Sequence, residues 1–333
     1  MTTAPQRLAG RVVDGALEAT VAGSFTTVGY RVRKRAGAWE ELPADALAGR
    51  TVLITGATSG LGLATAVAVA RLGARTLIWG RDAARTQRAA EHVGEQSGSE
   101  RIETVVADLA DLGAVRAAAE DLHRRLDRLD VLVHNAGALT HERRITADGL
   151  ELTYQTHVVA PFALTHATAP LLGPSSRVIT VSSGGMYTQP LRRSTLRTGG
   201  EPYDGVVAYA QAKRAQVLLN AEFAVRRPDM AQFHAMHPGW ADTPGVAASL
   251  PTFRRVVGRL LRTPEQGADT IVWLAATDPG PQPGQFWLDR RPRTTVRLPG
   301  TAASEETVQR LWEQVTADAG VASGGRAVSA PRR

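Results

Sequence analysis

The segment at residues 55–62, with the sequence TGATSGLG, constrains the fold of this chain more than any other. It follows an apolar run at residues 51–54 and precedes a second apolar segment, so it stands where a strand ends and a helix begins. Gly56 permits a tight turn there, and Gly60 and Gly62 let the backbone approach a pyrophosphate closely. Free N–H groups at a helix start also bind phosphate. The segment therefore predicts a site for a phosphate-bearing cofactor. A nucleoside triphosphatase loop is not supported, because no Lys-Ser or Lys-Thr pair follows the glycines.

Further apolar runs alternate with helical segments as far as residue 290. This alternation predicts an α/β protein, with a doubly wound Rossmann fold built on a seven-stranded parallel sheet. The seven predicted strands are residues 51–54, 75–79, 102–107, 130–134, 176–183, 232–237 and 285–288. Predicted helices include residues 111–126, 206–227 and 264–276. Ligands of such folds bind at the carboxyl ends of the strands.

Three regions are expected along the chain. Residues 1–49 form an N-terminal helical extension and linker, residues 50–300 the Rossmann domain, and residues 301–333 a C-terminal helix and flexible tail. Apolar residues in the extension recur every four positions, namely Val13, Leu17, Val21 and Phe25. This spacing predicts an amphipathic helix, and basic residues follow it at 31–35. The helix either docks on the main domain or makes a peripheral membrane contact.

Composition excludes several classes of function. The chain has no cysteine, which rules out disulfides, a thiolate nucleophile, an iron–sulfur cluster and a Cys-ligated zinc site. We predict no metal site. The formal charge of +7 is scattered without an aromatic-interleaved patch, so we expect no nucleic-acid partner. Neither a secretory signal nor an apolar run long enough to span a bilayer is present, and we expect a cytoplasmic protein, with a membrane-peripheral one as the alternative.

The end of the second predicted strand bears on the choice of cofactor. Gly80 and Arg81 stand where an NAD-selective protein presents a carboxylate to the ribose hydroxyls. A guanidinium there favours a 2′-phosphate, so NADP(H) is preferred over NAD(H). Two alternatives stay open, because Asp82 could compete for the ribose and Arg81 could be solvated.

A tyrosine and a lysine are spaced for chemistry on one helix face. Tyr209 and Lys213 are four residues apart, and Lys213 is one of only two lysines in the chain, the other being Lys34. A compact ammonium was therefore kept where arginine is otherwise used. A nearby cation that favours the phenolate would make the tyrosine a better proton shuttle. Ser183 ends an apolar strand beside the same crevice and could hold a substrate oxygen.

Taken together, TGATSGLG, the Asn-Ala-Gly at residues 135–137, Ser183, the YAQAK at 209–213 and the His-Pro-Gly at 237–239 resemble the short-chain dehydrogenase/reductase family of single-domain type. The likeness covers roughly residues 50 to 290, and further stretches, VSSGGM, YAQAKRAQV, MHPGWADTPGV and EQGADT, resemble one branch of that family. The resemblance implies hydride transfer between a nicotinamide cofactor and a small-molecule carbonyl or alcohol. It also implies a homo-oligomer.

Individual roles follow from the same resemblance. Tyr209 would donate or accept the proton, Ser183 would position the carbonyl, and Lys213 would bind the nicotinamide ribose and lower the pKa of the tyrosine. His157 matches an asparagine that commonly holds a relay water in the family, and it either takes that role or is a core histidine. The implied cofactor-binding residues are Gly56, Ser59, Leu61, Gly62, Arg81, Asp108, Leu109, Asn135, Ala136, Gly137, Lys213, Pro238, Gly239 and Thr243.

The segment after Gly239 mixes apolar residues with arginines. Its apolar members are Trp240, Val246, Leu250, Pro251, Phe253, Val256, Val257, Leu260 and Leu261, and its arginines are Arg254, Arg255, Arg259 and Arg262. It is either a lid that favours a lipophilic substrate or an ordinary packed helix. We therefore expect an NADP(H)-dependent oxidoreductase acting on a lipophilic carbonyl or alcohol. The alternative is a cofactor-binding regulatory or membrane-peripheral protein of the same fold with little turnover.

Overall fold

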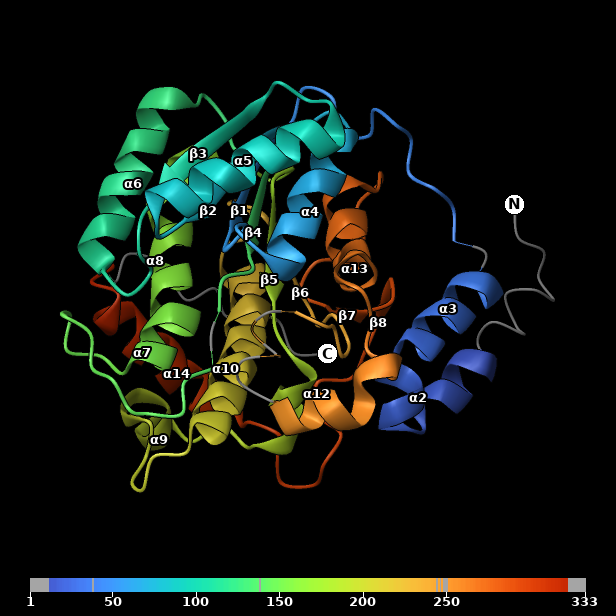
Figure 1. Cartoon of the computed structure of the whole chain (residues 1–333). Coiled ribbons are helices and arrows are strands. Elements are labelled where there is room, and N and C mark those ends of the chain that lie inside the picture. The colour runs from blue at the N-terminus through green and yellow to red at the C-terminus, as the bar shows by residue number, and fades with distance from the viewer. Residues whose placement is uncertain are drawn as a thin grey trace.

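A computed structural model of the chain describes residues 12–37, 39–137, 139–243, 245, 247 and 251–322. The predicted flexible tail beyond residue 322 lies outside the described residues. An eight-stranded sheet forms the centre of the molecule, with strand order β3-β2-β1-β4-β5-β6-β7-β8 (Figure 1). Its parallel strands are β1 (Thr51–Thr55), β2 (Arg75–Gly80), β3 (Ile102–Val106), β4 (Val131–His134), β5 (Arg177–Val181), β6 (Gln232–Met236) and β7 (Phe286–Leu288). The order reverses between β1 and β4, which confirms the predicted doubly wound Rossmann fold.

The sheet carries one strand more than the seven predicted. β8 (Arg291–Pro292) pairs with β7 in the antiparallel sense. The chain reverses through Asp289 and Arg290, whose φ angles are 53° and 58°. Two consecutive residues in the left-handed conformation form a two-residue turn between β7 and β8. The sequence did not indicate this turn, because glycine or asparagine usually occupies such positions and neither occurs here.

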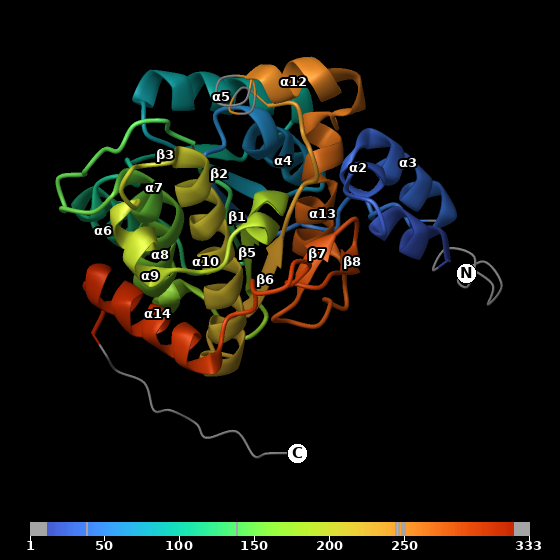
Figure 2. The ribbon, with the colours of Figure 1, turned by 90° about the horizontal axis from the view of Figure 1, so that it is seen from below.

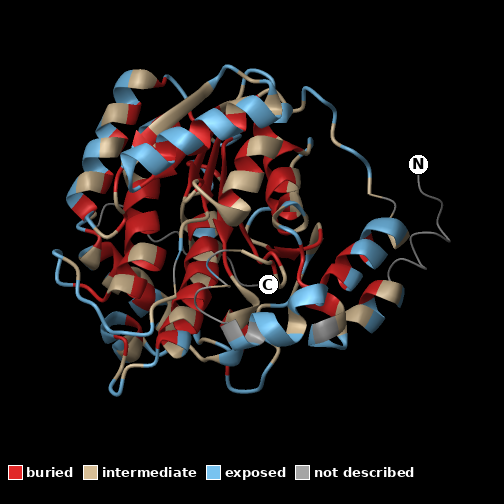
Figure 3. Ribbon diagram, viewed as in Figure 1, coloured by how far each residue is buried: buried red, intermediate tan, exposed pale blue. Residues whose placement is uncertain are grey.

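Helices cover both faces of the sheet. One face carries α4 (Gly60–Arg71), α5 (Ala83–Ser97) and α13 (Pro264–Ala276), and the other carries α6 (Leu112–Arg125), α8 (Ala160–Ala167), α10 (Gly205–Arg226) and α14 (Glu305–Asp318). Every side chain of β1 is buried because the two faces are both covered. Val52 and Ile54 belong to the core under α4 and α13, whereas Leu53 belongs to the core under α6, α8 and α10. Figure 3 shows the buried sheet between helices whose outer faces are exposed.

Capping residues explain where the predicted helices begin. Asp111 accepts a hydrogen bond from the Ala114 amide at 2.9 Å at the start of α6, and Asp204 caps α10 in the same way. Thr263 and Gln266 form a capping box at the start of α13. The remaining short elements are α7 (Leu152–Tyr154), a π-helical turn η1 (Gln155–Val159), η2 (Ala169–Leu171), η3 (Gly184–Thr188), α9 (Arg193–Thr198), α12 (Pro251–Val257) and η4 (Gly258–Leu260).

The N-terminal extension is helical, but it is not the single helix that the spacing of four predicted. Residues 12–18 form one helix, followed by α2 (Val21–Phe25) and α3 (Thr27–Ala36). The Thr20 hydroxyl accepts from the Gly23 amide at 3.1 Å and so starts α2 anew. The extended backbone of Thr26 separates α2 from α3. These helices lie beside β8 at one edge of the sheet (Figures 1 and 2). No helix in the described part of the chain is both long and apolar enough to cross a bilayer.

Candidate active site

The glycine-rich turn closes tightly between β1 and α4. Gly56 has φ +66°, and a Cβ there would lie 2.7 Å from the Cα of Ala136. A Cβ on Gly62 would overlap the Gly56 carbonyl oxygen, so neither glycine can be replaced without moving backbone. Ser59 precedes α4 in an extended conformation, and among the described residues its side chain makes no capping hydrogen bond. The first N–H groups of α4 are thus left for a ligand, and the turn fits a phosphate group.

Asn135 and Ala136 brace that turn from the end of β4. The Asn135 side-chain amide donates to the carbonyl oxygens of Thr55 and Gly56, at 3.0 and 3.2 Å. The Thr55 hydroxyl in turn accepts from the backbone N–H groups of Asn135 and Ala136, at 3.0 and 3.1 Å. Gly137 comes next, and a Cβ on it would overlap the His157 ring. The Asn-Ala-Gly segment therefore joins the glycine-rich turn to the neighbourhood of His157.

The end of β2 leaves no room for a carboxylate at Gly80. A Cβ on Gly80 would overlap the Thr86 hydroxyl and lie 2.7 Å from Cγ2 of Thr58, in the glycine-rich turn. Arg81 follows and is exposed. The Asp82 carboxylate accepts from the Arg85 amide at 2.8 Å and caps α5, which gives it a structural task of its own.

Asp108 and Leu109 follow β3 at the same edge of the sheet. The Asp108 carboxylate accepts from the Ala110 amide at 2.9 Å and shapes the loop. Leu109 is buried, and its carbonyl oxygen accepts from Gln155 at 3.5 Å. Both residues therefore lie in a defined turn at the sheet edge that also carries the glycine-rich segment, with the end of β2 between them.

Ser183, Tyr209 and Lys213 come together at the carboxyl end of β5. Helix α10 places Tyr209 and Lys213 one turn apart, and the Lys213 Nζ lies 5.5 Å from the centre of the Tyr209 ring. Ser183 follows β5 and accepts from the Gly185 amide at 3.2 Å, which starts the η3 turn. A Cβ on Gly185 would lie 3.5 Å from the Ser183 Oγ and 4.0 Å from Cε1 of Tyr209, so both side chains lie close to the same glycine. The three predicted catalytic groups thus form one cluster.

The electrostatics of this cluster differ from the prediction. Lys213 is 3% exposed and donates to the Val181 carbonyl oxygen at 2.9 Å, and burial lowers its pKa to about 7. Burial also raises the pKa of Tyr209, while the hydrogen bond with Ser183 opposes that rise. The sequence predicted a lowered tyrosine pKa. The buried ammonium instead bonds to a backbone carbonyl, and the phenol is protonated at neutral pH.

His157 lies beside the tyrosine in the π-helical turn. Its ring stands edge-on to the Tyr209 ring, with centroids 5.3 Å apart and an interplanar angle of 88°. The histidine is fully buried, and its carbonyl oxygen accepts from the Gln216 side chain at 2.7 Å. Single π-turns inside helices are common at functional sites, because the extra residue redirects one side chain. The placement next to Tyr209 is consistent with both predictions for His157, namely that it holds a relay water or that it is a core histidine.

A small cavity behind His157 contains polar groups that the sequence analysis did not single out. It lies between α8, α10 and the sheet, and its polar lining includes His134, Gln216 and Asn220. Within the described residues, both polar atoms of the Asn220 amide are buried without a protein hydrogen-bond partner. The remaining lining is mainly apolar, with Val158, Phe162 and Leu219 among its members. The signal was present in the sequence, because positions 209, 213, 216 and 220 share one face of α10.

The loop after β6 meets the N-terminal helices. Gly239 has φ +74°, and a Cβ there would lie 2.5 Å from Nε of Arg262 and 2.6 Å from the carbonyl oxygen of Phe25. Pro238 is buried beside it, and Thr243 is half-buried further along the loop. Phe25 was not predicted to lie near the site, and Arg262 was predicted only as an arginine of the segment that is either a lid or a packed helix. The contact between the two residues joins parts of the chain more than 230 residues apart.

The predicted lid segment divides into an exposed and a buried part. Val256 in α12 is 79% exposed and Leu260 in η4 is 43% exposed, whereas Leu261 and Arg262 are buried. Arg262 is therefore an interior anchor and not one of the surface arginines of a lid. The predicted lid residues Val246 and Leu250 lie outside the described residues.

Comparison with known proteins agrees with this geometry. Residues 50–252 match the family model for short chain dehydrogenases. The chain is 38% identical over 275 residues to dehydrogenase/reductase SDR family member 12 of Homo sapiens, which covers 80% of this chain and 86% of that protein. It is 33% identical over 279 residues to polyprenol dehydrogenase of Mus musculus, which covers 80% of this chain and 82% of the relative.

A solved structure from Beutenbergia cavernae is also similar, with a TM-score of 0.55, 31% identity, and coverage of 70% of this chain and 92% of that one. It is described as a candidate NAD(P)-dependent gluconate 5-dehydrogenase with NADP bound at low occupancy. The family match covers the whole cofactor turn and the Ser183, Tyr209 and Lys213 cluster. On this evidence, the chain belongs to the short-chain dehydrogenase/reductase family of oxidoreductases.

Proposed function

We propose that this protein is an NADP(H)-dependent oxidoreductase that interconverts a lipophilic carbonyl compound and its alcohol. The observation that carries the proposal is the meeting of Ser183, Tyr209 and Lys213 at the sheet edge that also carries the glycine-rich turn. In the reductive direction, a hydride adds to the carbonyl carbon and a proton to its oxygen, while the C=O π bond breaks. A bound nicotinamide cofactor supplies the hydride.

The side chains of this chain handle the oxygen and the proton. Ser183 and Tyr209 both lie close to Gly185, so their hydroxyls can hold one carbonyl oxygen between them. Tyr209 donates its proton to that oxygen, and its raised pKa keeps the proton in place until negative charge develops there. Lys213, with a pKa of about 7, is suited to binding a hydroxyl group or to passing a proton near neutrality. A protonated resting tyrosine favours reduction as the physiological direction.

The preference for NADP(H) rests on the end of β2. Arg81 is exposed beside the glycine-rich turn, whereas Gly80 cannot carry a side chain and Asp82 caps α5. A guanidinium is the group best suited to bind a 2′-phosphate. A lipophilic substrate is supported by the similarity to a polyprenol dehydrogenase.

The direct test is consumption of NADPH and of NADH across a panel of aldehydes, ketones and quinones of increasing chain length. We expect turnover with NADPH that improves with the apolar character of the substrate. Tight NADPH binding without turnover on any member of the panel would favour the regulatory alternative. Faster turnover with NADH would overturn the cofactor assignment.

A peripheral membrane contact is a second candidate, favoured by one face of α3. Val28, Arg31, Val32 and Arg35 are spaced for one face of the helix, and all four are exposed. Sedimentation with vesicles of anionic and of zwitterionic lipid tests the contact. Binding to anionic vesicles that is lost in Val32→Glu supports it, and absence of binding to either vesicle refutes it.

A further inference from the structure

Phe25, the last residue of α2, touches two turns of the active site. Its ring is 3% exposed and lies against the turn that follows Ser183, where a Cβ on Gly184 would be 2.5 Å from the Phe25 ring. The Phe25 carbonyl oxygen occupies the space that a Cβ on Gly239 would need, 2.6 Å from that position. Both turns therefore present a glycine to the same residue, and neither glycine could be replaced while Phe25 stays in place. The His237 ring packs edge-on to Phe25 with centroids 4.6 Å apart.

Backbone hydrogen bonds tie Phe25 to the loop after β6. The Phe25 carbonyl oxygen accepts from the Trp240 amide at 2.8 Å and from Arg262 Nε at 3.0 Å. Arg262 is itself paired with that loop, because its amide donates to the Trp240 carbonyl at 2.7 Å and its carbonyl accepts from the Asp242 amide at 2.8 Å. The end of α2 is thus hydrogen-bonded into the loop that carries Gly239.

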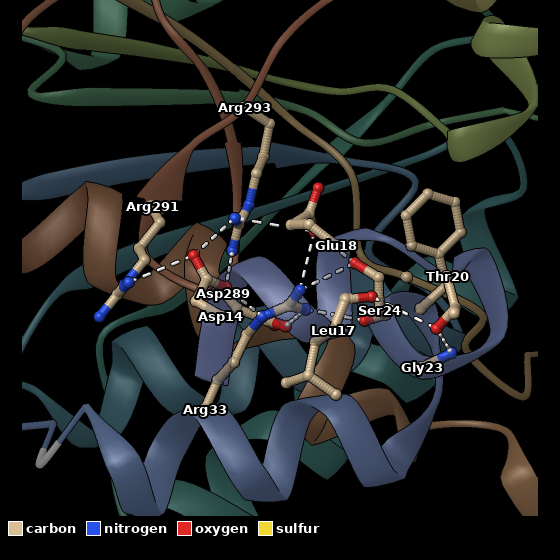
Figure 4. Close-up of polar contacts among 12 residues, drawn as sticks. Asp14, Leu17, Glu18, Thr20, Gly23, Ser24, Arg33, Asp289, Arg291 and Arg293 are labelled. Carbon is tan, nitrogen blue, oxygen red and sulfur yellow. Dashed lines mark hydrogen bonds and ion pairs between the residues drawn. The ribbon is translucent and has the colours of Figure 1, made fainter. Parts of the chain in front are cut away.

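A buried charge cluster holds α2 in this position. Arg33 of α3 forms ion pairs with Asp14 at 2.6 Å, with Glu18 at 2.7 Å and with Asp289 at 2.8 Å (Figure 4). Asp289 is 1% exposed and also accepts two hydrogen bonds from Arg262, at 2.6 and 2.8 Å. The carboxylate after β7 therefore joins an arginine of the N-terminal helices to the arginine that binds the Phe25 carbonyl.

The same two arginines also fix the residue before Phe25. The Ser24 carbonyl oxygen accepts from Arg33 at 2.8 Å and from Arg262 at 2.9 Å. Burial raises the pKa of Asp14, but hydrogen bonds from Arg293 and Arg33 outweigh it and lower that pKa to about 2. Asp14 consequently stays ionised at neutral pH, and its ion pair with Arg33 helps to hold the end of α2 in place.

We propose that Phe25 is a positioning residue for the active site, and that the N-terminal helices are part of the catalytic unit. Clamped by the Arg33, Asp289 and Arg262 cluster, Phe25 keeps the turn that carries Ser183 and the loop that carries Gly239 in fixed relative placement. Because the Ser183 hydroxyl caps that turn by accepting from the Gly185 amide, a shift of the turn displaces the hydroxyl proposed to hold the substrate oxygen. The inference rests on the proposed reduction of a carbonyl.

The test compares Phe25→Ala with Phe25→Leu, which restores most of the apolar volume, and with Val21→Ala, an exposed position of the same helix α2. For Phe25→Ala we expect kcat per folded molecule to fall at least about tenfold, since displacement of a catalytic group by about 1 Å costs that much or more. Affinity for NADPH should fall less than kcat does, because the glycine-rich turn is untouched and only the loop at Gly239 shifts. Phe25→Leu should recover most of kcat, and Val21→Ala should match the wild type. Folded molecules are counted by NADPH titration.

Hydrogen exchange supplies a readout that does not depend on turnover. We expect faster amide exchange in Phe25→Ala at residues 182–188 and 237–243, without a change in α4 or α5, and a smaller effect in Phe25→Leu. If Phe25→Ala has the kcat of the wild type and the same amide exchange in both turns, the inference is overturned. So would a loss of activity that only follows the loss of folded protein. Should the wild type reduce no carbonyl, the proposed function fails, and exchange alone decides the role of Phe25. If Phe25→Ala does not fold, the same comparison is made with Phe25→Leu.

Discussion

The Lys213 ammonium lies 5.5 Å from the centre of the Tyr209 ring and donates a hydrogen bond to the carbonyl oxygen of Val181 at 2.9 Å. A buried cation with a backbone carbonyl as its acceptor is costly to ionise, and burial accordingly lowers the pKa of Lys213 to about 7. This buried lysine lies next to Tyr209, the proposed proton donor.

Replacing Lys213 by methionine should stabilise the cofactor-free protein near neutral pH. The unfolded lysine titrates at about 10.4, so between pH 7 and 10 the unfolded chain binds one more proton than the folded chain. Wild-type stability therefore rises with pH in that window relative to Lys213→Met. The advantage of the variant should be full below pH 7 and shrink by at most about 1.4 kcal/mol per pH unit above it. Urea unfolding from pH 6 to 10 measures it. A pH-independent difference would contradict the depressed lysine pKa.

Gly62→Ala should abolish tight cofactor binding. The added Cβ would overlap the Gly56 carbonyl oxygen and lie 2.5 Å from the Asn135 amide nitrogen, so the phosphate-binding turn must move. We expect affinity for NADPH to fall at least about tenfold, measured by fluorescence titration. Gly94→Ala in α5 is the matched control, because its Cβ meets nothing closer than 3.5 Å. That control should gain about 0.5–1 kcal/mol in stability and bind NADPH normally.

Arg81→Ala should weaken NADPH binding without changing NADH binding. Loss of a charge-assisted bond to the 2′-phosphate costs about 1.5–3 kcal/mol, or roughly ten- to hundredfold in affinity. Asp82→Ala is the control, since Asp82 caps α5 and its loss should cost about 1 kcal/mol of stability. The NADPH to NADH affinity ratio should be unchanged in that control. Equal loss of both cofactors in Arg81→Ala would refute the phosphate assignment.

Asp289→Ala should be strongly destabilising. Asp289 is buried between Arg33 and Arg262, and removing it leaves two buried guanidinium groups without their carboxylate. The expected cost is about 3–5 kcal/mol of unfolding free energy. Arg254→Ala breaks an exposed ion pair of similar length, 2.8 Å to Asp242, and should leave the free energy of unfolding close to the wild-type value. Comparable effects of the two changes in urea unfolding would show that the buried cluster is not a clamp.

Local patterns predicted most of the Rossmann core. The helix at residues 264–276 was predicted with the bounds that it has, because Thr263 and Pro264 mark its start and apolar periodicity its length. The strands were predicted within about two residues because buried parallel strands are continuous apolar runs. The extension was misread because the spacing of four spans two capping threonines, Thr20 and Thr26, where the chain restarts its helix. The capping residues were the better signal.

The site was only partly predictable for a different reason. Motifs locate Tyr209 and Lys213 because both lie on one helix and their spacing is local. Phe25 and Arg262 meet across 237 positions of the chain, and no periodicity reports such a contact. The direction of the Tyr209 pKa also depends on burial, which is a property of the assembled cleft. Sequence therefore predicted the residues that we propose to react, but not the N-terminal contacts that we propose to position them.

The most direct measurement of the central claim is turnover by Tyr209→Phe with NADPH and the best carbonyl substrate of the panel. The change removes one oxygen and keeps the ring that packs against His157. For Tyr209→Phe we predict unchanged NADPH affinity and a fall in kcat of about 10²–10⁴, which is the contribution of a positioned acid. Wild-type turnover by this variant would contradict the assignment of Tyr209 as the proton donor.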